Sequence, residues 1–383
     1  MQPNFTQEEV LRYSRHLILS EVGFEGQKKL KSSSVMIVGT GGLGSPAALY
    51  LAAAGIGRIG LVDYDLVDSS NLQRQVIHGG DQVGNLKVES ARKRMVDLNP
   101  YIQVETFNDI FSSENAESIA EGYDLIIDGT DNFPTRYLIN DLCVMTGRPF
   151  VYGSIFRFEG QVSVFHASSG PCYRCLFPEP PPPGSVPSCA EAGVFGILPG
   201  TIGTLQATEA IKWICGMGTS LVGRLLLYDA LDMTFQTIKL KKNPSCKICG
   251  SHPEITKLID YEDFCGTSIQ GEDVGVNPIK QLAPWEVDQR LKAGEKLTLL
   301  DVRREMEQQI SGLPGATQIH FDKLEESISM LDKTQPIVVY CRTGKRSARA
   351  VRKLEKAGFD QVYNLRGGIN AWAREVDPSM YQY

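Results

Sequence analysis

The sequence of 383 residues lacks any long run of uncharged hydrophobic residues. Its N-terminal stretch has no basic flank followed by an apolar core, and no later stretch is long enough and free enough of charge to span a bilayer. Positive charge is also in deficit, since 39 lysines and arginines face 45 aspartates and glutamates, which argues against nucleic-acid binding as the main role. We therefore expect a soluble cytoplasmic protein with neither a nucleic-acid nor a membrane partner.

Disulfide bonds are not expected either. The 9 cysteines are an odd number, and two C-x-x-C pairs among them have the spacing typical of metal ligands. These pairs are Cys172 with Cys175 and Cys246 with Cys249. Four thiolates at tetrahedral spacing predict a closed structural zinc site (Zn²⁺) that takes no part in catalysis, with buried free cysteines as the alternative.

Other side chains suited to nucleophilic chemistry are scarce. The 5 histidines form no nucleophile constellation, and we expect a structural role for His78. Cys143 and Cys215 fall on apolar helical stretches and Cys265 has no partner spacing, so all three are expected to pack. Cys189 differs, because it lies between a proline-rich loop and a helix, where a thiolate can be exposed and stabilised.

The length suits two or three domains, and 42% hydrophobic residues suffice to form their cores. Up to about residue 150, strands and helices alternate in the pattern of a doubly wound, Rossmann-like α/β sheet. Antiparallel strands and another helix complete a first domain over residues 1–265. Residues 266–278 contain glycines and little apolar periodicity, which predicts a linker, and a second α/β pattern fills residues 279–383.

The N-terminal helix is predicted to begin at a capping box formed by Thr6 and Glu9 and to continue through EEVLRYSRHLIL. Arg12 and Arg15 would lie one turn apart on one side, where both are free to bind an anion. The apolar residues expected to pack are Leu11, Leu17 and Ile18.

A glycine motif, G-x-G-x-x-G, occurs at Gly39, Gly41 and Gly44 between a predicted strand and a predicted helix. Backbone N–H groups and the helix dipole at such a turn can hold phosphate. Asp63 ends the next strand and could bind a ribose hydroxyl. The motif alone does not separate NAD from ATP.

The residues after this motif favour ATP. Arg74 and Lys87 can neutralise phosphates, and Asp131, in GTDN after another strand, can hold Mg²⁺. These are the groups needed for attack on an α-phosphorus, whereas hydride transfer has no use for them. The alternative is that they form surface salt bridges beside a dinucleotide site.

A basic loop, YCRTGKRS, follows a predicted strand near the end of the chain. Successive backbone N–H groups together with Arg342, Lys345 and Arg346 would face the sulfur of Cys341 and stabilise a thiolate or persulfide. A core cysteine at a strand end is the alternative, and the loop also resembles a phosphatase cradle.

Several segments closely resemble the MoeB and ThiF family, relatives of the ubiquitin-activating enzymes. They are VGTGGLGSPAALYLAAAGIG, LVDYDLVDSSNLQRQ, DGTDNFPTRYLIN, CYRCLFP, CAEAGVFG and PSCKICG. The final hundred or so residues resemble a rhodanese domain, which the loop length and Asp301 with Arg303 in LLDVR favour over a phosphatase, although Gly312 stands where rhodaneses commonly have histidine. The combination is similar to the molybdopterin-synthase adenylyltransferase and sulfurtransferase group, which includes the MoeZ type.

This resemblance implies an ATP–Mg²⁺ site that adenylates the C-terminal glycine of a ubiquitin-like sulfur-carrier protein ending in Gly-Gly. Asp131 would bind the metal, and Arg15 would reach into the nucleotide site of a second subunit, which requires a homodimer. The implied nucleotide contacts are Gly42, Asp63, Ser70, Asn71, Leu72, Gln73, Arg74, Lys87, Asp131 and Asn132.

The resemblance also implies how sulfur is handled. Cys341 would carry it as a persulfide within a loop made of Arg342, Thr343, Gly344, Lys345 and Arg346. Cys189 matches a loop cysteine that forms a covalent intermediate in some relatives and is merely retained in others. The product would be a carrier thiocarboxylate, with the sulfur supplied by a donor such as a cysteine desulfurase or thiosulfate.

Two other functions remain open from the sequence. One is an NAD-dependent Rossmann oxidoreductase, and the other is a non-catalytic scaffold that binds the carrier. The presence of Asp131, Arg74 and Lys87 argues against the scaffold, because an inactive relative would be free to lose them.

Overall fold

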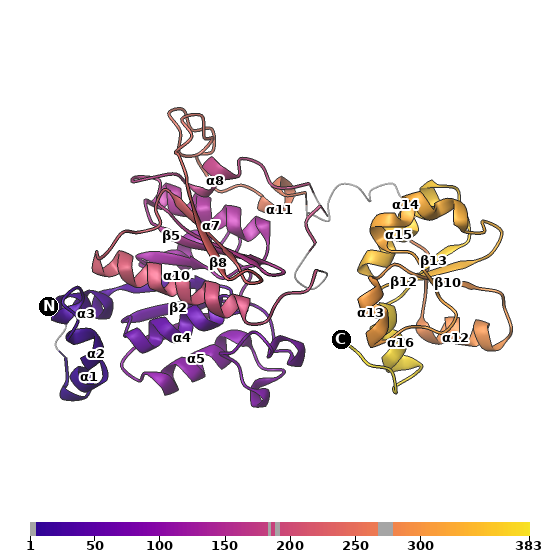
Figure 1. The fold of residues 1–383 in the computed structure, drawn as a ribbon, viewed down its shortest axis with the longest axis horizontal. Helices are drawn as coiled ribbons and strands as arrows, with labels where there is room; N and C mark the ends of the chain where they lie inside the picture. The colour runs from indigo at the N-terminus through magenta and orange to yellow at the C-terminus, as the bar shows by residue number, and fades with distance from the viewer. Residues whose placement is uncertain (1–4, 183–184, 188–191, 267–278) are drawn as a thin grey trace. The chain divides into compact units, whose positions relative to one another are not determined.

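The structure is a computed structural model that describes residues 5–182, 185–187, 192–266 and 279–383 (Figure 1). The chain divides into two compact units, Met1–Ile269 and Gln270–Tyr383. Except for Gly266, the predicted linker over residues 266–278 lies outside the described residues, so its exact bounds stay a prediction. None of the described helices is long and apolar enough to cross a membrane.

Three short helices open the first unit: α1 (Gln7–Arg12), α2 (Ser14–Leu17) and α3 (Gly23–Ser32). The predicted capping box is confirmed, because Thr6 and Glu9 each bind the other's backbone N–H. The continuous helix after it is wrong, since the chain leaves helical geometry at Tyr13. Tyr13 is buried and its hydroxyl accepts a hydrogen bond from Asn99 Nδ2 at 2.8 Å, so a tertiary contact accompanies the break.

One further expectation for this region is wrong. Leu11 and Ile18 are 76% and 74% exposed, respectively, so they do not pack within the described part of this chain. Arg12 donates to the Leu98 carbonyl at 2.8 Å and lies over the Tyr101 ring. Its binding of an anion stays a prediction.

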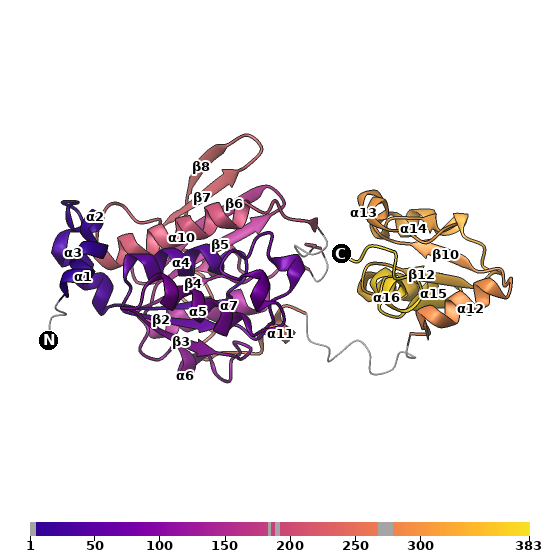
Figure 2. The ribbon, with the colours of Figure 1, turned by 90° about the horizontal axis from the view of Figure 1, so that it is seen from below.

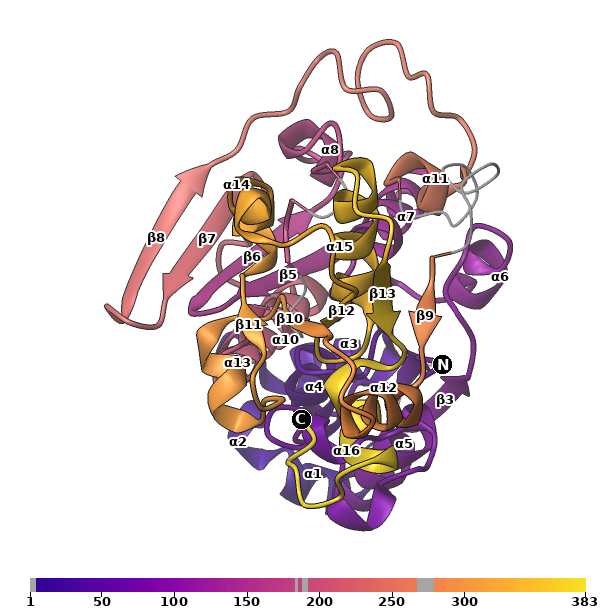
Figure 3. The same cartoon turned by 90° about the vertical axis from the view of Figure 1, so that its right-hand side faces the viewer.

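The first unit is built on an eight-stranded sheet in the order β3-β2-β1-β4-β5-β6-β7-β8. Pairing is parallel from β3 to β5 and antiparallel from β5 to β8. The strands are β1 (Ser34–Val38), β2 (Arg58–Val62), β3 (Gln103–Phe107), β4 (Leu125–Asp128), β5 (Phe150–Phe156), β6 (Glu159–Phe165), β7 (Arg224–Asp229) and β8 (Thr234–Lys239). Figure 3 shows β7 and β8 as a hairpin at the edge of this sheet.

Helices cover both faces of the sheet, as the predicted doubly wound fold requires (Figure 2). Alternate residues of β1 show this, because Val35 and Ile37 join one core cluster while Met36 and Val38 join the other. The first cluster packs beneath α4 (Gly44–Ala54), α5 (Lys87–Leu98) and α10 (Leu198–Cys215). The second packs beneath α6 (Ala116–Ala120), α7 (Phe133–Thr146), α8 (Tyr173–Leu176) and α11 (Tyr261–Phe264).

The second unit has a parallel five-stranded sheet in the order β11-β10-β12-β13-β9. The strands are β9 (Gln281–Leu282), β10 (Thr298–Asp301), β11 (Thr317–Gln318), β12 (Ile337–Tyr340) and β13 (Val362–Leu365). The helices are α12 (Pro284–Lys292), α13 (Glu305–Ile310), α14 (Leu324–Ser327), α15 (Lys345–Lys356) and α16 (Gly368–Glu375). Residues of α14 and α15 pack on one face and residues of α12 and α16 on the other, which is an α/β arrangement.

A buried ion pair joins three parts of the first unit. Asp141 of α7 and Arg174 of α8 are almost fully buried and make two hydrogen bonds of 2.8 Å. The Tyr261 hydroxyl of α11 donates to the same carboxylate at 2.9 Å. The Arg174 guanidinium also lies over the rings of Tyr137 and Phe264, so its charge is compensated by a carboxylate and by two aromatic faces.

We expect Asp141→Ala to lower the free energy of unfolding of the first unit by about 3–5 kcal/mol, because Arg174 would remain as a buried, uncompensated cation. The matched control is Asp97→Ala, which removes an exposed carboxylate paired with Arg94 and should cost less than about 1 kcal/mol. Denaturant titration of both variants measures the difference. Equal small losses would contradict the structural importance of the buried pair.

Candidate functional site

The glycine turn after β1 depends on very close backbone contacts. Gly39 has φ +90°, and its N–H donates to the Val62 carbonyl of β2 at 2.8 Å. A Cβ on Gly44 would lie 1.9 Å from the Gly39 carbonyl oxygen, and one on Gly129 would lie 2.5 Å from it. The turns after β1 and β4 therefore touch, and only glycine fits at these positions. Because apolar Leu43 stands at the N-cap of α4, no side chain competes for the first amides of that helix.

Asp63 connects this turn to the end of β2. Its Oδ2 accepts hydrogen bonds from the Thr40 N–H at 2.8 Å and from the Thr40 hydroxyl at 2.9 Å. Its Oδ1 accepts from the Asp65 N–H at 3.0 Å. Asp63 thus lies beside the glycine turn, and the proposed contact with ribose stays a prediction.

His78 contacts the same turn through the Thr40 carbonyl. Its Nε2 lies 3.2 Å from the Thr40 carbonyl oxygen and its Nδ1 lies 2.9 Å from the Ser90 hydroxyl. Burial lowers the pKa of His78, so the ring is neutral near pH 7. A neutral ring must carry its proton on Nε2 to donate to the carbonyl, while Nδ1 accepts from Ser90. The structural role expected for His78 fits these contacts.

The segment after β2 folds over the glycine turn. It contains the 3₁₀ turn η1 (Ser69–Asn71), and Arg74 donates to the Ser70 carbonyl at 3.2 Å. A Cβ on Gly42 would lie 3.0 Å from Pro199 at the start of α10 and 3.8 Å from Arg74 Cγ. A Cβ on Gly196 would lie 2.1 Å from Gln73 Oε1. The structure therefore brings Gly42, Gln73 and Arg74 together, with Ser70, Asn71 and Leu72 in the same segment.

Lys87 is the first residue of α5 and is buried, and its Nζ binds Asp65 Oδ2 at 2.7 Å. The sequence analysis did not anticipate this acidic partner. Lys87 and Asp65 both lie near the carboxyl end of β2, since the Lys87 N–H donates to the Asp65 carbonyl at 2.9 Å. A phosphate at this place would compete with Asp65 for the ammonium group.

Tyr64 stands between two of the carboxylates that follow β2. Burial raises the pKa of the Tyr64 phenol, and the negative charges of Asp65, Asp63 and Asp131 raise it further. The role of Asp131 as a magnesium ligand stays a prediction. Asn132 follows Asp131 and caps α7, with its Oδ1 accepting from the Thr135 N–H at 2.9 Å.

Asp128 and Arg136 form a site element that the sequence analysis missed. They are buried, with Arg136 Nε 2.9 Å from Asp128 Oδ2, and Asp128 Oδ1 also accepts from the N–H and hydroxyl of Thr130. Burial acts to lower the pKa of Arg136, but the charge of Asp128 outweighs it and the pKa is raised, so the pair is ionic. These contacts fix the turn that presents Asp131. The sequence did contain a signal for this pair. Asp128 ends the apolar strand LIID, and a buried charge needs a partner.

The two C-x-x-C pairs meet in space. The four sulfur atoms of Cys172, Cys175, Cys246 and Cys249 lie within 4.8 Å of one another. Three of the separations are 3.8 Å (Cys172 to Cys175), 3.6 Å (Cys172 to Cys246) and 3.4 Å (Cys175 to Cys249). A tetrahedral ion with metal–sulfur bonds of about 2.3 Å needs sulfurs about 3.8 Å apart, so the cluster fits a metal ion.

The roles predicted for Arg15 and Cys189 stay predictions. Arg15 lies exposed on α2, where a single chain does not test its predicted reach into a second subunit. Cys189 lies outside the described residues. The three cysteines expected to pack, Cys143, Cys215 and Cys265, are all buried.

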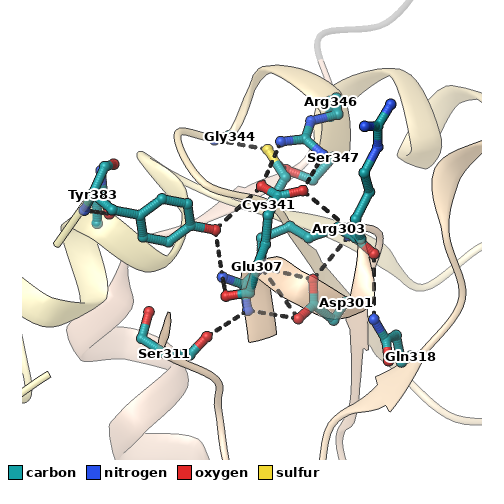
Figure 4. Close-up of polar contacts among 12 residues, drawn as sticks. Asp301, Arg303, Glu307, Ser311, Gln318, Cys341, Gly344, Arg346, Ser347 and Tyr383 are labelled. Carbon is teal, nitrogen blue, oxygen red and sulfur yellow. Dashed lines mark hydrogen bonds and ion pairs between the residues drawn. The ribbon is translucent and has the colours of Figure 1, made fainter. Parts of the chain in front are cut away.

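In the second unit, Cys341 follows β12 and is 2% exposed (Figure 4). Its Sγ accepts a hydrogen bond from the Gly344 N–H at 3.2 Å and lies 3.5 Å from the Ser347 hydroxyl. Gly344 has φ +91°, which turns its N–H toward the sulfur at the start of α15. The loop thus supplies one backbone donor to the sulfur, where successive N–H groups were predicted.

Two of the three cations of this loop have partners other than the sulfur. Both terminal nitrogens of Arg346 bind the Glu307 carboxylate, at 2.9 and 2.8 Å, and Arg342 lies 5.7 Å from the centre of the Tyr383 ring. The sequence analysis missed Glu307 and Tyr383, because neither lies near Cys341 in the sequence. Buried Asp301 and Arg303 form a further ion pair beside them.

Comparisons with known proteins agree with both halves of this description. A model of the ThiF family matches residues 13–248, and a model of the rhodanese-like domain matches residues 283–375. "Probable adenylyltransferase/sulfurtransferase MoeZ" of Mycobacterium tuberculosis is 48% identical, over 99% of this chain and 96% of the relative. "Adenylyltransferase and sulfurtransferase MOCS3" of Sus scrofa is 43% identical, over 99% of this chain and 88% of the relative.

Among solved structures, E. coli MccB aligns with a TM-score of 0.58 at 23% identity, over 66% of this chain and 75% of that one. This likeness supports the fold alone. The comparisons give no support to an oxidoreductase. With the glycine turn, the four-cysteine cluster and the Cys341 loop in place, the chain belongs to the ThiF family, in the group that joins this domain to a rhodanese-like domain and whose members are named adenylyltransferase and sulfurtransferase.

Proposed function

We propose that this enzyme adenylates the C-terminal glycine of a ubiquitin-like sulfur-carrier protein and then converts it to a thiocarboxylate with sulfur carried on Cys341. The observation that carries the proposal is the presence in one chain of a glycine turn that lies against Arg74 and of a cysteine whose sulfur accepts a backbone N–H. The first constellation suits acyl adenylation, and the second suits an anionic sulfur.

In the first step a carrier carboxylate oxygen attacks the α-phosphorus of ATP, and pyrophosphate leaves. The amides at the start of α4, together with Arg74 and Lys87, would bind the phosphates, and Asp131 would hold the metal. When bound, Mg²⁺ offsets the charge on the phosphate oxygens. The Asp128–Arg136 pair would keep the Asp131 turn in position.

In the second step the terminal sulfur of a Cys341 persulfide attacks the activated carbonyl, and AMP leaves. This forms an acyl disulfide between carrier and enzyme, and a thiol must then attack the Cys341 sulfur to release the thiocarboxylate and leave a new disulfide. We propose Cys189 as that thiol, or as the earlier acceptor of the acyl group as a thioester. Its position in the sequence between a proline-rich loop and a helix supports this role.

We further propose that the enzyme acts as a cytoplasmic homodimer. Exposed apolar side chains near the N-terminus, Leu11 and Ile18, support a partner surface. A hollow of about 440 Å³ lies between α2, α4 and α10, lined in part by His16, Tyr50 and Thr204. Arg15 on α2 would then be supplied to the second copy's nucleotide site, as its family resemblance implies.

The zinc assignment yields a direct test. We expect one zinc per chain, with Cys246→Ser lowering both zinc content and the thermal unfolding temperature, because a structural metal contributes its binding energy to folding. Elemental analysis and calorimetry measure the two effects. Cys143→Ser is the matched control, since that buried cysteine lies outside the four-sulfur cluster. Full folding of a zinc-free protein would overturn the assignment.

The two activities should separate by mutation. We expect Asp131→Ala to reduce ATP–pyrophosphate exchange about a hundredfold or more, because it removes a metal ligand, while sulfur transfer from thiosulfate to cyanide continues. Cys341→Ser should have the opposite pattern and should abolish thiocarboxylate formation when inorganic sulfide is excluded.

The matched control for the first variant is Asp97→Ala, an exposed carboxylate on α5 that should leave both reactions intact. Exchange kinetics and mass spectrometry of carrier proteins provide the measurements. Near wild-type exchange by Asp131→Ala would refute the metal position, and unchanged thiocarboxylate formation by Cys341→Ser would refute Cys341 as the sulfur carrier.

A further inference from the structure

Tyr383 lies against the persulfide loop although 42 positions of sequence separate it from Cys341 (Figure 4). Its hydroxyl accepts a hydrogen bond from Arg303 Nη1 at 2.8 Å and donates to Glu307 Oε1 at 3.2 Å. Its ring lies beneath the guanidinium of Arg342, with 5.7 Å between the guanidinium carbon and the ring centre. The Tyr383 side chain therefore contacts Arg342 directly and also contacts Glu307, which binds Arg346.

Glu307 transmits this contact to the second cation. Burial acts to raise the pKa of the Glu307 carboxyl, but the hydrogen bonds from Arg346 outweigh it and the pKa is lowered, so the group is ionised near pH 7. The carboxylate binds both terminal nitrogens of Arg346 and also accepts from Tyr383. Such a bidentate pair fixes the orientation of the guanidinium.

The backbone of Tyr383 is held by the helix that also holds the loop. Asn370 Nδ2 of α16 donates to the main-chain oxygen of Tyr383 at 2.8 Å, and Asn370 Oδ1 accepts from the Tyr383 N–H at 3.4 Å. The Asn370 N–H donates to the Arg342 carbonyl at 3.1 Å, and the adjacent Ile369 N–H donates to the Cys341 carbonyl at 2.9 Å. One helix end thus fixes both the cysteine loop and the residue that contacts its cations.

We propose that Tyr383 is a positioning residue for sulfur transfer at Cys341, holding Arg342 directly and Arg346 through Glu307 so that both cations stay beside the sulfur loop. This inference rests on the proposed role of Cys341. Arg342 directly follows Cys341, and Arg346 lies in the first turn of α15, one residue before Ser347, whose hydroxyl faces the sulfur. A cation that leaves this loop for solvent lowers the local positive potential and so disfavours an anionic sulfur.

The test is the pH dependence of alkylation at Cys341, followed by mass spectrometry of its peptide with iodoacetamide as the probe. Tyr383→Ala removes the ring and the hydroxyl, and we expect it to raise the alkylation midpoint by about half a pH unit, which slows the reaction about threefold below the midpoint. Tyr383→Phe keeps the ring beneath Arg342 but removes the hydroxyl that binds Glu307, so it should raise the midpoint by less than Tyr383→Ala does. Tyr381→Ala removes a 74% exposed tyrosine two residues earlier and should leave the midpoint unchanged.

A double-mutant cycle tests the route through Glu307. The effect of Tyr383→Phe should become smaller in a Glu307→Gln background, because the charge that the hydroxyl and Arg346 share is then gone. An unchanged or lowered midpoint in Tyr383→Ala would overturn the proposal. If that variant fails to fold, Tyr383→Phe decides, and the proposal fails when neither its midpoint nor its rate of sulfur transfer from thiosulfate differs from wild type.

This design separates the inference from the proposed function. Failure of the unmodified enzyme to take up sulfur on Cys341 from thiosulfate or a small-molecule persulfide would count against the proposed function. The alkylation midpoint does not require sulfur transfer, so it reports on Tyr383 in either case.

Discussion

The close contact between the turns after β1 and β4 is the constraint on which the nucleotide half of the molecule depends. The Gly39 carbonyl oxygen occupies space that a side chain on Gly44 or Gly129 would need. This contact brings the start of α4 next to the turn that carries Asp131, so the first amides of α4 and the Asp131 turn lie at one edge of the sheet. Asp63 and His78 then fix the turn from the side of β2.

Buried charge supports this arrangement from within. The Asp128–Arg136 pair lies next to the Asp131 turn. The Asp141–Arg174 pair involves a later residue of α7, and Arg174 stands between Cys172 and Cys175 in the sequence. Both carboxylates are fully buried and both pairs involve α7. Because a lone buried charge is far more costly than a pair, these contacts restrict how α7 can pack and so link the turn after β4 to the four-cysteine cluster.

The two kinds of sulfur site differ in what surrounds the sulfur. The four clustered cysteines face one another, which leaves no open position on a tetrahedral ion for substrate. Cys341 instead faces a backbone N–H and a hydroxyl, which stabilise an anionic sulfur without binding it to a metal. Cysteine sulfur can therefore hold the first unit together as a metal ligand and act as a reactive centre in the second unit.

Local sequence patterns determined much of this molecule. Alternating apolar strands and helices predicted both α/β sheets, and the glycine spacing predicted the turn after β1. The C-x-x-C pairs predicted a four-cysteine site, and the fold does bring these cysteines together across more than seventy positions of sequence. These features succeed because periodicity and spacing act over short stretches of chain. Arg12, Arg346 and the helix break at Tyr13 were decided by tertiary structure, since their partners Leu98, Glu307 and Asn99 are distant in sequence. The pairing of a charge or a buried hydroxyl depends on which distant segments the fold brings into contact, so a local sequence pattern does not predict it.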